Sequence, residues 1–89
     1  MVEDRVTIEN KYGFHARPST TFAQMAVGFS CQIEVSVEDQ RVDGKSVMGL
    51  LTLGAPQGTV IGIHCDGPDE AEALQALTAH VRDRFGGIE

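Results

Sequence analysis

The sequence predicts an α+β fold, an open-faced β-sandwich in which three helices cover one face of a four-stranded antiparallel sheet. Segments with a two-residue hydrophobic period alternate along the chain with segments of helical period, in the order βαββαβα. Gly or Pro stands at most of the boundaries between these segments. A length of 89 residues suffices for one modest core, so we expect residues 1–89 to form a single domain.

The first two elements are predicted to be a strand and a helix. Val2–Ile8 is expected to form the strand, with Val6 and Ile8 on its buried face. Ala16–Val27 is expected to form the helix, because Pro18 suits a first helical turn and a glycine follows the last one. The residues of this helix that should face the core, at helical spacing, are Ser19, Phe22, Ala23 and Ala26.

The middle of the chain predicts a hairpin and a short helix. Cys31–Val37 alternates cleanly between apolar and polar residues, and Arg41–Asp43 is expected to return beside it as a short edge strand. Val47–Leu53 should then form a helix of two turns, with Leu50 and Leu53 facing inward.

A fourth strand and a last helix complete the prediction. Thr59–Cys65 has the period of a strand, and residues 69–84 have the period of a helix. The expected buried stripe of that helix is Leu74, Leu77, Thr78 and Val81. Right-handed crossovers make the first two strands parallel and leave a slot between them, which the fourth strand should fill.

The charge of the chain argues against nucleic acid as a partner. The chain contains thirteen Asp and Glu and only seven Lys and Arg, which gives a formal net charge of -6. Tyr12 is the only Tyr or Trp, so the chain offers neither a basic groove for phosphates nor an aromatic platform for bases.

Targeting, disulfide and metal signals are also missing from the sequence. The N-terminal residues do not resemble a signal peptide, and no apolar run could span a bilayer, so we expect a cytoplasmic protein with no membrane partner. Cys31 and Cys65 could lie close together on the covered face of the sheet. A cross-strand disulfide is conceivable there, but we expect buried, reduced thiols. His64 and Cys65 are consecutive on a strand and point to opposite faces, so no metal site is predicted. His80 is expected on the exposed side of the last helix.

A candidate nucleophile, His15, stands immediately before the first predicted helix in the sequence GFHARP, residues 13–18. Helix N-termini favour anions, phosphate above all, and neutral imidazole is a nucleophile. Arg17 adds a guanidinium that can bind phosphoryl oxygens, and Pro18 stiffens the turn. A plain loop or capping role for His15 remains the alternative on these residues alone.

Ser46 and the short helix after it also allow two interpretations. Ser46 is placed to cap the helix, and its hydroxyl is equally a candidate for phosphorylation beside Lys45. Met48 and Leu51 project away from the inward leucines, either as ordinary exposed apolar residues or as the centre of a partner-binding patch.

Taken together, the two segments resemble the HPr family, the histidine-containing phosphocarriers of the bacterial phosphoenolpyruvate-dependent sugar phosphotransferase system. Residues 13–18 are similar to the active-site motif of the family. Residues 44–54, GKSVMGLLTLG, are similar to its regulatory-serine motif. Residues 66–74 are similar to its entry into the last helix, so the resemblance covers essentially the whole chain.

The resemblance implies a role for each matching residue. His15 would accept a phosphoryl group from phosphorylated enzyme I and pass it to an enzyme IIA domain, with Arg17 stabilising the phosphoryl oxygens and Ala16 and Pro18 supporting the loop. Ser46 would be the target of an HPr kinase/phosphorylase, and its phosphate would be read by that kinase or by a transcription regulator. The family implies a carrier that needs no cofactor, turns over no small-molecule substrate alone and works as a monomer. Its partner-docking residues would be Val47, Met48 and Leu51.

The chain departs from the family pattern around the proposed docking surface. Ser19 replaces a common Ala and could place a hydroxyl near the phosphate. Gln24, Val27 and Gly49 stand where many members carry Lys, so electrostatic steering toward acidic partners should be weaker. Two other hypotheses remain: a regulatory module read chiefly through Ser46, and an unrelated ferredoxin-like ligand-binding domain in which both motifs are coincidental.

Overall fold

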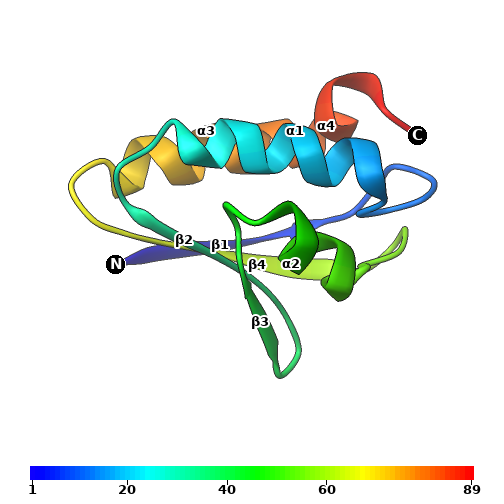
Figure 1. Cartoon of the computed structure of the whole chain (residues 1–89), viewed down its shortest axis with the longest axis horizontal. Helices are drawn as coiled ribbons and strands as arrows, with labels where there is room; N and C mark the ends of the chain where they lie inside the picture. Colours follow the sequence, from blue (N-terminus) through cyan, green and yellow to red (C-terminus); the bar gives the residue numbers. More distant parts are fainter.

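A computed structural model describes the whole chain, residues 1–89, as one sheet with helices on one side (Figure 1). The α+β class and the order of the main elements are those that the sequence predicts. No helix is both long and apolar enough to cross a membrane. The elements are β1 Val2–Thr7, α1 Ala16–Val27, β2 Gln32–Val37, β3 Gln40–Asp43, α2 Val47–Leu53, β4 Val60–Asp66, α3 Glu70–Arg82 and α4 Arg84–Gly87.

The strand order is β1-β4-β2-β3, and every neighbouring pair is antiparallel. β4 therefore fills the slot between the parallel strands β1 and β2, which confirms the predicted topology. Val6 pairs with Ile61, and Val35 with Ile63, so the apolar residues of three strands line the same face. α1 and α3 lie side by side above that face, and α2 lies beside β3 (Figure 1).

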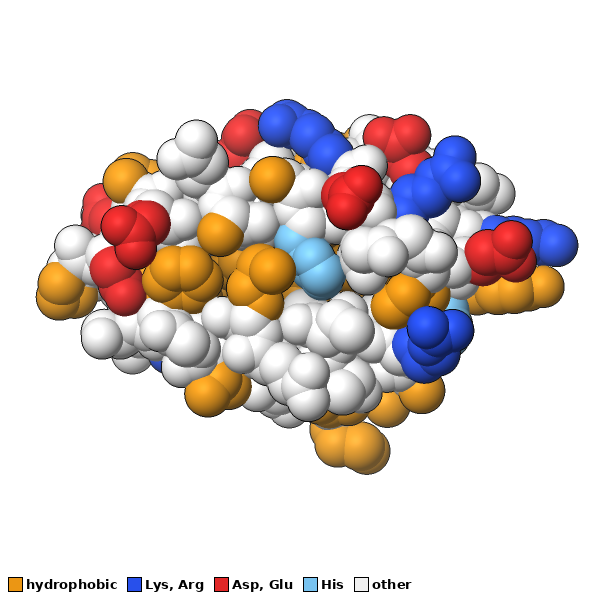
Figure 2. Space-filling model, turned by 90° about the horizontal axis from the view of Figure 1, so that it is seen from above, with side chains coloured by type: hydrophobic (Ala, Val, Ile, Leu, Met, Phe, Trp, Pro, Cys, Tyr) orange, Lys and Arg blue, Asp and Glu red, His pale blue; other side chains and the backbone are white.

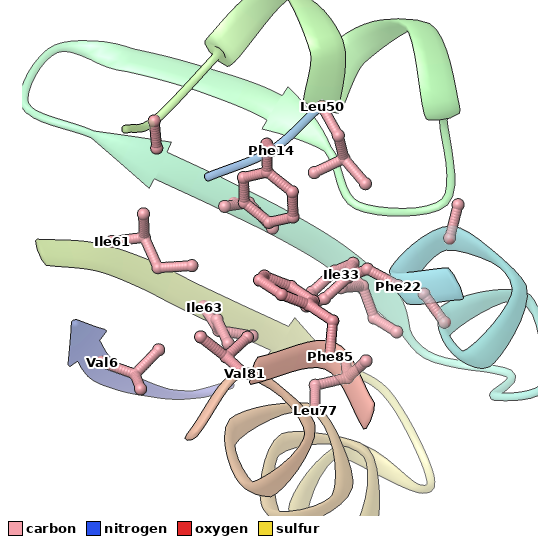
Figure 3. Close-up of a cluster of buried hydrophobic side chains, with 14 of the residues drawn as sticks. Val6, Phe14, Phe22, Ile33, Leu50, Ile61, Ile63, Leu77, Val81 and Phe85 are labelled. Carbon is pink, nitrogen blue, oxygen red and sulfur yellow. The ribbon is translucent and has the colours of Figure 1, made fainter. Parts of the chain in front are cut away.

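The core lies between these helices and the sheet, and Figure 3 shows its central side chains. Phe22 of α1 is fully buried, as the helical spacing predicts, and its ring packs edge-on against Phe14. Leu50 of α2 and Leu77 of α3 close the two ends of the cluster. Leu74, expected in the buried stripe, is only partly buried, and Ala73 is buried instead.

The last helix ends earlier than expected. α3 stops at Arg82 rather than near residue 84, because Arg84 and Phe85 adopt left-handed backbone angles, with φ of 54° and 55°. This turn buries Phe85, whose ring packs 5.2 Å from that of Phe14. The hydrophobic period of the sequence does not predict the short helix α4, because its conformation depends on the packing of Phe85 in the core.

Cys31 and Cys65 are free and buried on the covered side of the sheet, as expected. Burial, followed by the neighbouring thiol of Cys31, raises the pKa of Cys65 to about 11. Burial likewise raises the pKa of Cys31. Both thiols are therefore protonated and poorly reactive at neutral pH.

Asp69 joins the start of α3 to the loop before β2. Its Oδ2 accepts a hydrogen bond from the backbone N–H of Ser30 at 2.8 Å, and its Oδ1 accepts one from that of Cys31 at 2.9 Å. The bond from Ser30, the larger effect, and those from Cys31 lower the pKa of Asp69. The carboxylate form of Asp69 thus stabilises the folded chain.

We expect Asp69→Asn to lower stability at pH 7, because one of the two backbone N–H groups loses its acceptor. A carboxyl with a lowered folded pKa stabilises the fold above its unfolded pKa of about 3.9 and ceases to do so as the pH falls through the folded pKa. The free energy of unfolding, measured with urea between pH 7 and pH 2, should decline below about pH 4 in the wild type. The decline should be smaller in the variant. Asp39→Asn, at a carboxylate with no hydrogen bond, is the control, and equal slopes in all three proteins would contradict the prediction.

Candidate functional site

His15 is the residue immediately before the first turn of α1. Its backbone is extended, with φ of -86° and ψ of -169°, and its carbonyl oxygen accepts the N–H of Ser19 at 3.1 Å. The imidazole makes no capping hydrogen bond to the helix. The main chain of His15 therefore begins the helix while its half-exposed ring stays available for chemistry.

The loop before His15 is fixed by a close backbone approach. Gly13 has a φ of 59°, and a Cβ at this position would lie 1.9 Å from the carbonyl oxygen of Ala55. The buried side chain of Asn10 donates to the Gly13 carbonyl at 2.8 Å, and the N–H of Phe14 donates to Ala55 at 3.3 Å. Glycine at position 13 is thus what lets the loop lie against the chain at Ala55 and aim His15.

The hydrogen bond of the His15 ring determines which nitrogen carries the lone pair. Nε2 lies 2.7 Å from the backbone oxygen of Glu89, and an oxygen of this kind only accepts. In the neutral ring Nε2 therefore carries the hydrogen, and Nδ1 keeps its lone pair. Tyr12 packs edge-on against the same ring, with the centroids 5.9 Å apart. Nothing in the sequence spacing indicates the contacts with Glu89 or Tyr12, because they depend on the fold of the C-terminal turn and the loop.

The side chain of Arg17 is exposed in the first turn of α1 and makes no salt bridge or hydrogen bond with another residue. The same turn contains no acidic residue. Ala16 is exposed beside it, whereas Pro18 is buried and anchors the turn. On the helical side, Lys and Arg side chains lie toward the end of the molecule where the loop before α1 and the C-terminus lie, with Asp and Glu side chains among them (Figure 2). An anion beside Arg17 would meet its positive charge and the unpaired N–H groups at the start of α1.

His80 is not on the exposed side of the last helix, so that expectation is wrong. Its ring packs edge-on against Phe85, and Nε2 lies 3.4 Å from the hydroxyl of Thr21 on α1. Burial lowers the pKa of His80, and the neighbouring carboxylate of Asp83 only partly offsets this effect. The inward turn at Phe85, which the sequence does not indicate, creates this environment.

Ser46 caps α2 as its spacing predicts. Its Oγ accepts the backbone N–H of Gly49 at 3.0 Å, while the hydroxyl hydrogen has no partner. The neighbouring Lys45 is engaged elsewhere, because its Nζ donates to the carbonyl of Phe29 at 2.8 Å. Lys45 is therefore already paired and not poised beside the Ser46 hydroxyl.

The three candidate docking residues on α2 differ in exposure. Met48 is 71% exposed and Leu51 is 37% exposed, whereas Val47 is partly buried against the core. α2 packs against α1, so this apolar surface adjoins the helix that His15 begins.

Two residues at which the chain departs from the family pattern, Val27 and Ser19, differ in exposure. Val27 is 61% exposed and adds an apolar side chain to the surface at the end of α1. Ser19 is fully buried with no partner for its hydroxyl, so a phosphate on the half-exposed ring of His15 would not meet this hydroxyl. The expectation that Ser19 adds a hydroxyl near the phosphate is therefore wrong.

Comparison with known proteins gives a match over nearly the whole chain. Residues 2–83 match the family described as "PTS HPr component phosphorylation site". The phosphocarrier protein HPr of Neisseria meningitidis serogroup A is 48% identical over 86 residues, which are 97% of this chain and 97% of that protein.

Solved structures of similar proteins share the fold. A crystal structure of HPr from Thermoanaerobacter tengcongensis has a TM-score of 0.94 at 42% identity and covers 100% of both chains. The catabolite repression protein Crh of Bacillus subtilis, whose crystal structure is described as a domain-swapped dimer, has a TM-score of 0.76 at 36% identity, over 94% of this chain and 97% of that one.

We expect Gly13→Ala to destabilise the chain by about 1 to 3 kcal/mol more than Gly58→Ala. Both glycines have positive φ, but an added Cβ at Gly58 would meet no atom within 4 Å, so this pair of variants isolates the collision with Ala55. Urea unfolding measures the difference, and amide chemical shifts of residues 10–17 report whether the loop has moved. Equal losses of stability in the two variants would show that the close approach does not hold the loop.

Proposed function

The chain belongs to the HPr family of phosphocarriers of the phosphotransferase system, and we propose that it carries the phosphoryl group on Nδ1 of His15. Phosphorylated enzyme I would donate the group, and an enzyme IIA domain would receive it. The observation that supports this role most strongly is the bond from Nε2 to the Glu89 oxygen, which in the neutral ring leaves the lone pair on Nδ1, beside the start of α1. We propose that residues 1–89 act as one domain, without a cofactor.

The transfer step follows from this geometry. The Nδ1 lone pair attacks phosphorus, the Nδ1–P bond forms, and the bond between phosphorus and enzyme I breaks, with its electron pair returning to enzyme I. The Glu89 oxygen offsets the positive charge that develops on the ring as Nε2 keeps its hydrogen. The charge on the three phosphoryl oxygens would be compensated by Arg17, which has no competing partner, in a reaction that depends on positioning and charge. The protein is thus a carrier, with no turnover of a small molecule on its own.

Docking of the larger partners would use the apolar surface of α2. Met48 and Leu51 supply its exposed part, and Val47 supports it from the core side. Gln24, Val27 and Gly49 add no charge to this surface, so association with the partners should depend little on ionic strength. We further propose that the carrier acts as a monomer in the cytoplasm, unlike the domain-swapped Crh.

A regulatory role for Ser46 is supported by its position on the same helix. Phosphorylation by an HPr kinase/phosphorylase would replace the free hydroxyl hydrogen with a phosphoryl group. Its nearly doubly negative charge would lie within one helical turn of Met48. The charge would weaken docking of enzyme I and create a form that the kinase or a transcription regulator recognises. The similarity to Crh, which is described as a catabolite repression protein, favours this second role.

We expect incubation with phosphoenolpyruvate and enzyme I to add one acid-labile phosphate, measured by intact mass before and after acid treatment. His15→Ala should abolish the label, and Arg17→Ala should slow its transfer by about 100-fold, because the oxygens lose their fixed cation. The control His80→Gln removes a different histidine and should keep the label. Labelling that persists in His15→Ala would overturn the assignment.

Ser46→Asp should slow phosphorylation by enzyme I by about 10-fold at low salt, with a smaller effect at high salt, because it places a charge in the docking surface. Asp is also a good helix cap, so the fold should be preserved. Gln75→Glu adds the same charge on the exposed side of α3 and serves as the control. A similar slowing in both variants would mean that net charge, and not the place of the charge, governs docking.

A further inference from the structure

The open face of the sheet, opposite the helices, carries a cluster of polar side chains from all four strands. His64 of β4 pairs with Glu3 of β1, and Ser36 of β2 pairs with Arg41 of β3. His64 is only 7% exposed although no helix covers this face. Its neighbours bury the ring, and neither the fold nor the phosphocarrier role requires such a cluster.

The hydrogen bonds of the cluster set the protonation of the His64 ring. Nε2 lies 2.8 Å from Ser36 Oγ and 3.4 Å from Nη2 of Arg41. A guanidinium only donates, so Nε2 is an acceptor, and the Ser36 hydroxyl donates its hydrogen to it. The hydrogen of the ring is then on Nδ1, which has no hydrogen-bond partner and whose nearest acid is Glu3 Oε2 at 3.6 Å. A small rotation of the exposed Glu3 side chain would close that gap.

Gly62 allows the serine and the histidine to meet. A Cβ at position 62 would lie 2.6 Å from Ser36 Oγ and 3.0 Å from His64 Nε2. The two side chains therefore occupy space that any other residue would fill. A groove of about 390 Å³ opens beside them, with Arg5, Glu38 and Arg41 among its lining residues. Ser36 is partly exposed and lines this groove.

We propose that Ser36 is a second nucleophile of this protein, activated by His64 and Glu3, and that it accepts the acyl group of small carboxylic esters. Ser36 Oγ attacks the ester carbonyl carbon and passes its proton to His64 Nε2. The Oγ–C bond forms, the bond from carbon to the alkoxide breaks, and the leaving oxygen takes the proton back from Nε2. Glu3 holds the charged ring, and Arg41, kept in place by Glu34 at 3.2 Å, is the donor available to the carbonyl oxygen.

This reaction is separate from phosphoryl transfer. His15 begins α1, which lies on the covered side of the sheet (Figure 1). Ser36 and His64 each follow a core residue, Val35 and Ile63, along their strands and so lie on the open side. Acylation of Ser36 therefore does not depend on His15. Its presence or absence in the experiment below leaves the proposed role of His15 unchanged.

The test is acetylation by p-nitrophenyl acetate in the His15→Ala background, which removes the exposed imidazole that would otherwise react. We expect a burst of one equivalent of nitrophenolate, with the acetyl group located on Ser36 by peptide mass mapping. Ser36 should react about 100-fold faster than Ser30, an exposed serine with no histidine beside it. Ser36→Ala should abolish the burst.

Two variants and a control test the activation. His64→Gln should slow acetylation of Ser36 by about 100-fold. Glu3→Gln should slow it by about 10-fold, and because the Glu3 side chain is exposed, this substitution should not disturb the fold. His80→Gln, at a half-buried histidine far from this face, should leave the rate unchanged. Equal rates at Ser36 and Ser30, or a Ser36 rate that Glu3→Gln and His64→Gln both leave unchanged, would overturn the proposal. If the His64→Gln variant does not fold, the acetylation rate of Ser36 in Glu3→Gln alone tests the activation.

Discussion

The burial of Phe14 is the interaction on which the arrangement of this protein depends most. Its ring packs against Phe22 of α1 and against Phe85 of α4, so one side chain joins the loop, the first helix and the C-terminal turn. His15 follows directly in the chain. Because Phe14 is held in the core and Gly13 lies against Ala55, the main chain of His15 has little freedom, and its ring emerges at a fixed place beside α1.

The local charge at this place differs from that of the whole molecule. The chain has a formal net charge of -6, yet Arg17 is the only charged side chain between Phe14 and Phe29. The thirteen carboxylates all lie outside this segment, on the four strands, in or just before α3, and in the loops, turns and C-terminal residues. An acidic protein can thus offer a phosphate-receptive surface, because the field near a site is set by the nearest charges and helix ends rather than by the sum.

Prediction from the sequence succeeded where structure depends on local periodicity and failed where it depends on tertiary contacts. Helical spacing predicted the bounds of α1 and α2, and the handedness of the crossovers predicted the slot for β4. The capping by Ser46 was predictable because a serine precedes an apolar helical run. The left-handed turn at Phe85 was not, because its cause is the space beside Phe14. The same turn explains the error at His80. The Ser36–His64 pair also escaped prediction, since it joins two strands whose register is set only when β4 enters the sheet.

The two buried thiols have a practical consequence for studying the docking events. At a pKa of about 11, only roughly one Cys65 side chain in ten thousand is ionised at pH 7, and maleimides react with the ionised form. A single cysteine introduced on the exposed surface of α2 should therefore take a fluorophore or spin label selectively in the otherwise native chain. Partner encounters could then be followed in real time without first removing Cys31 and Cys65 and disturbing the packing around them.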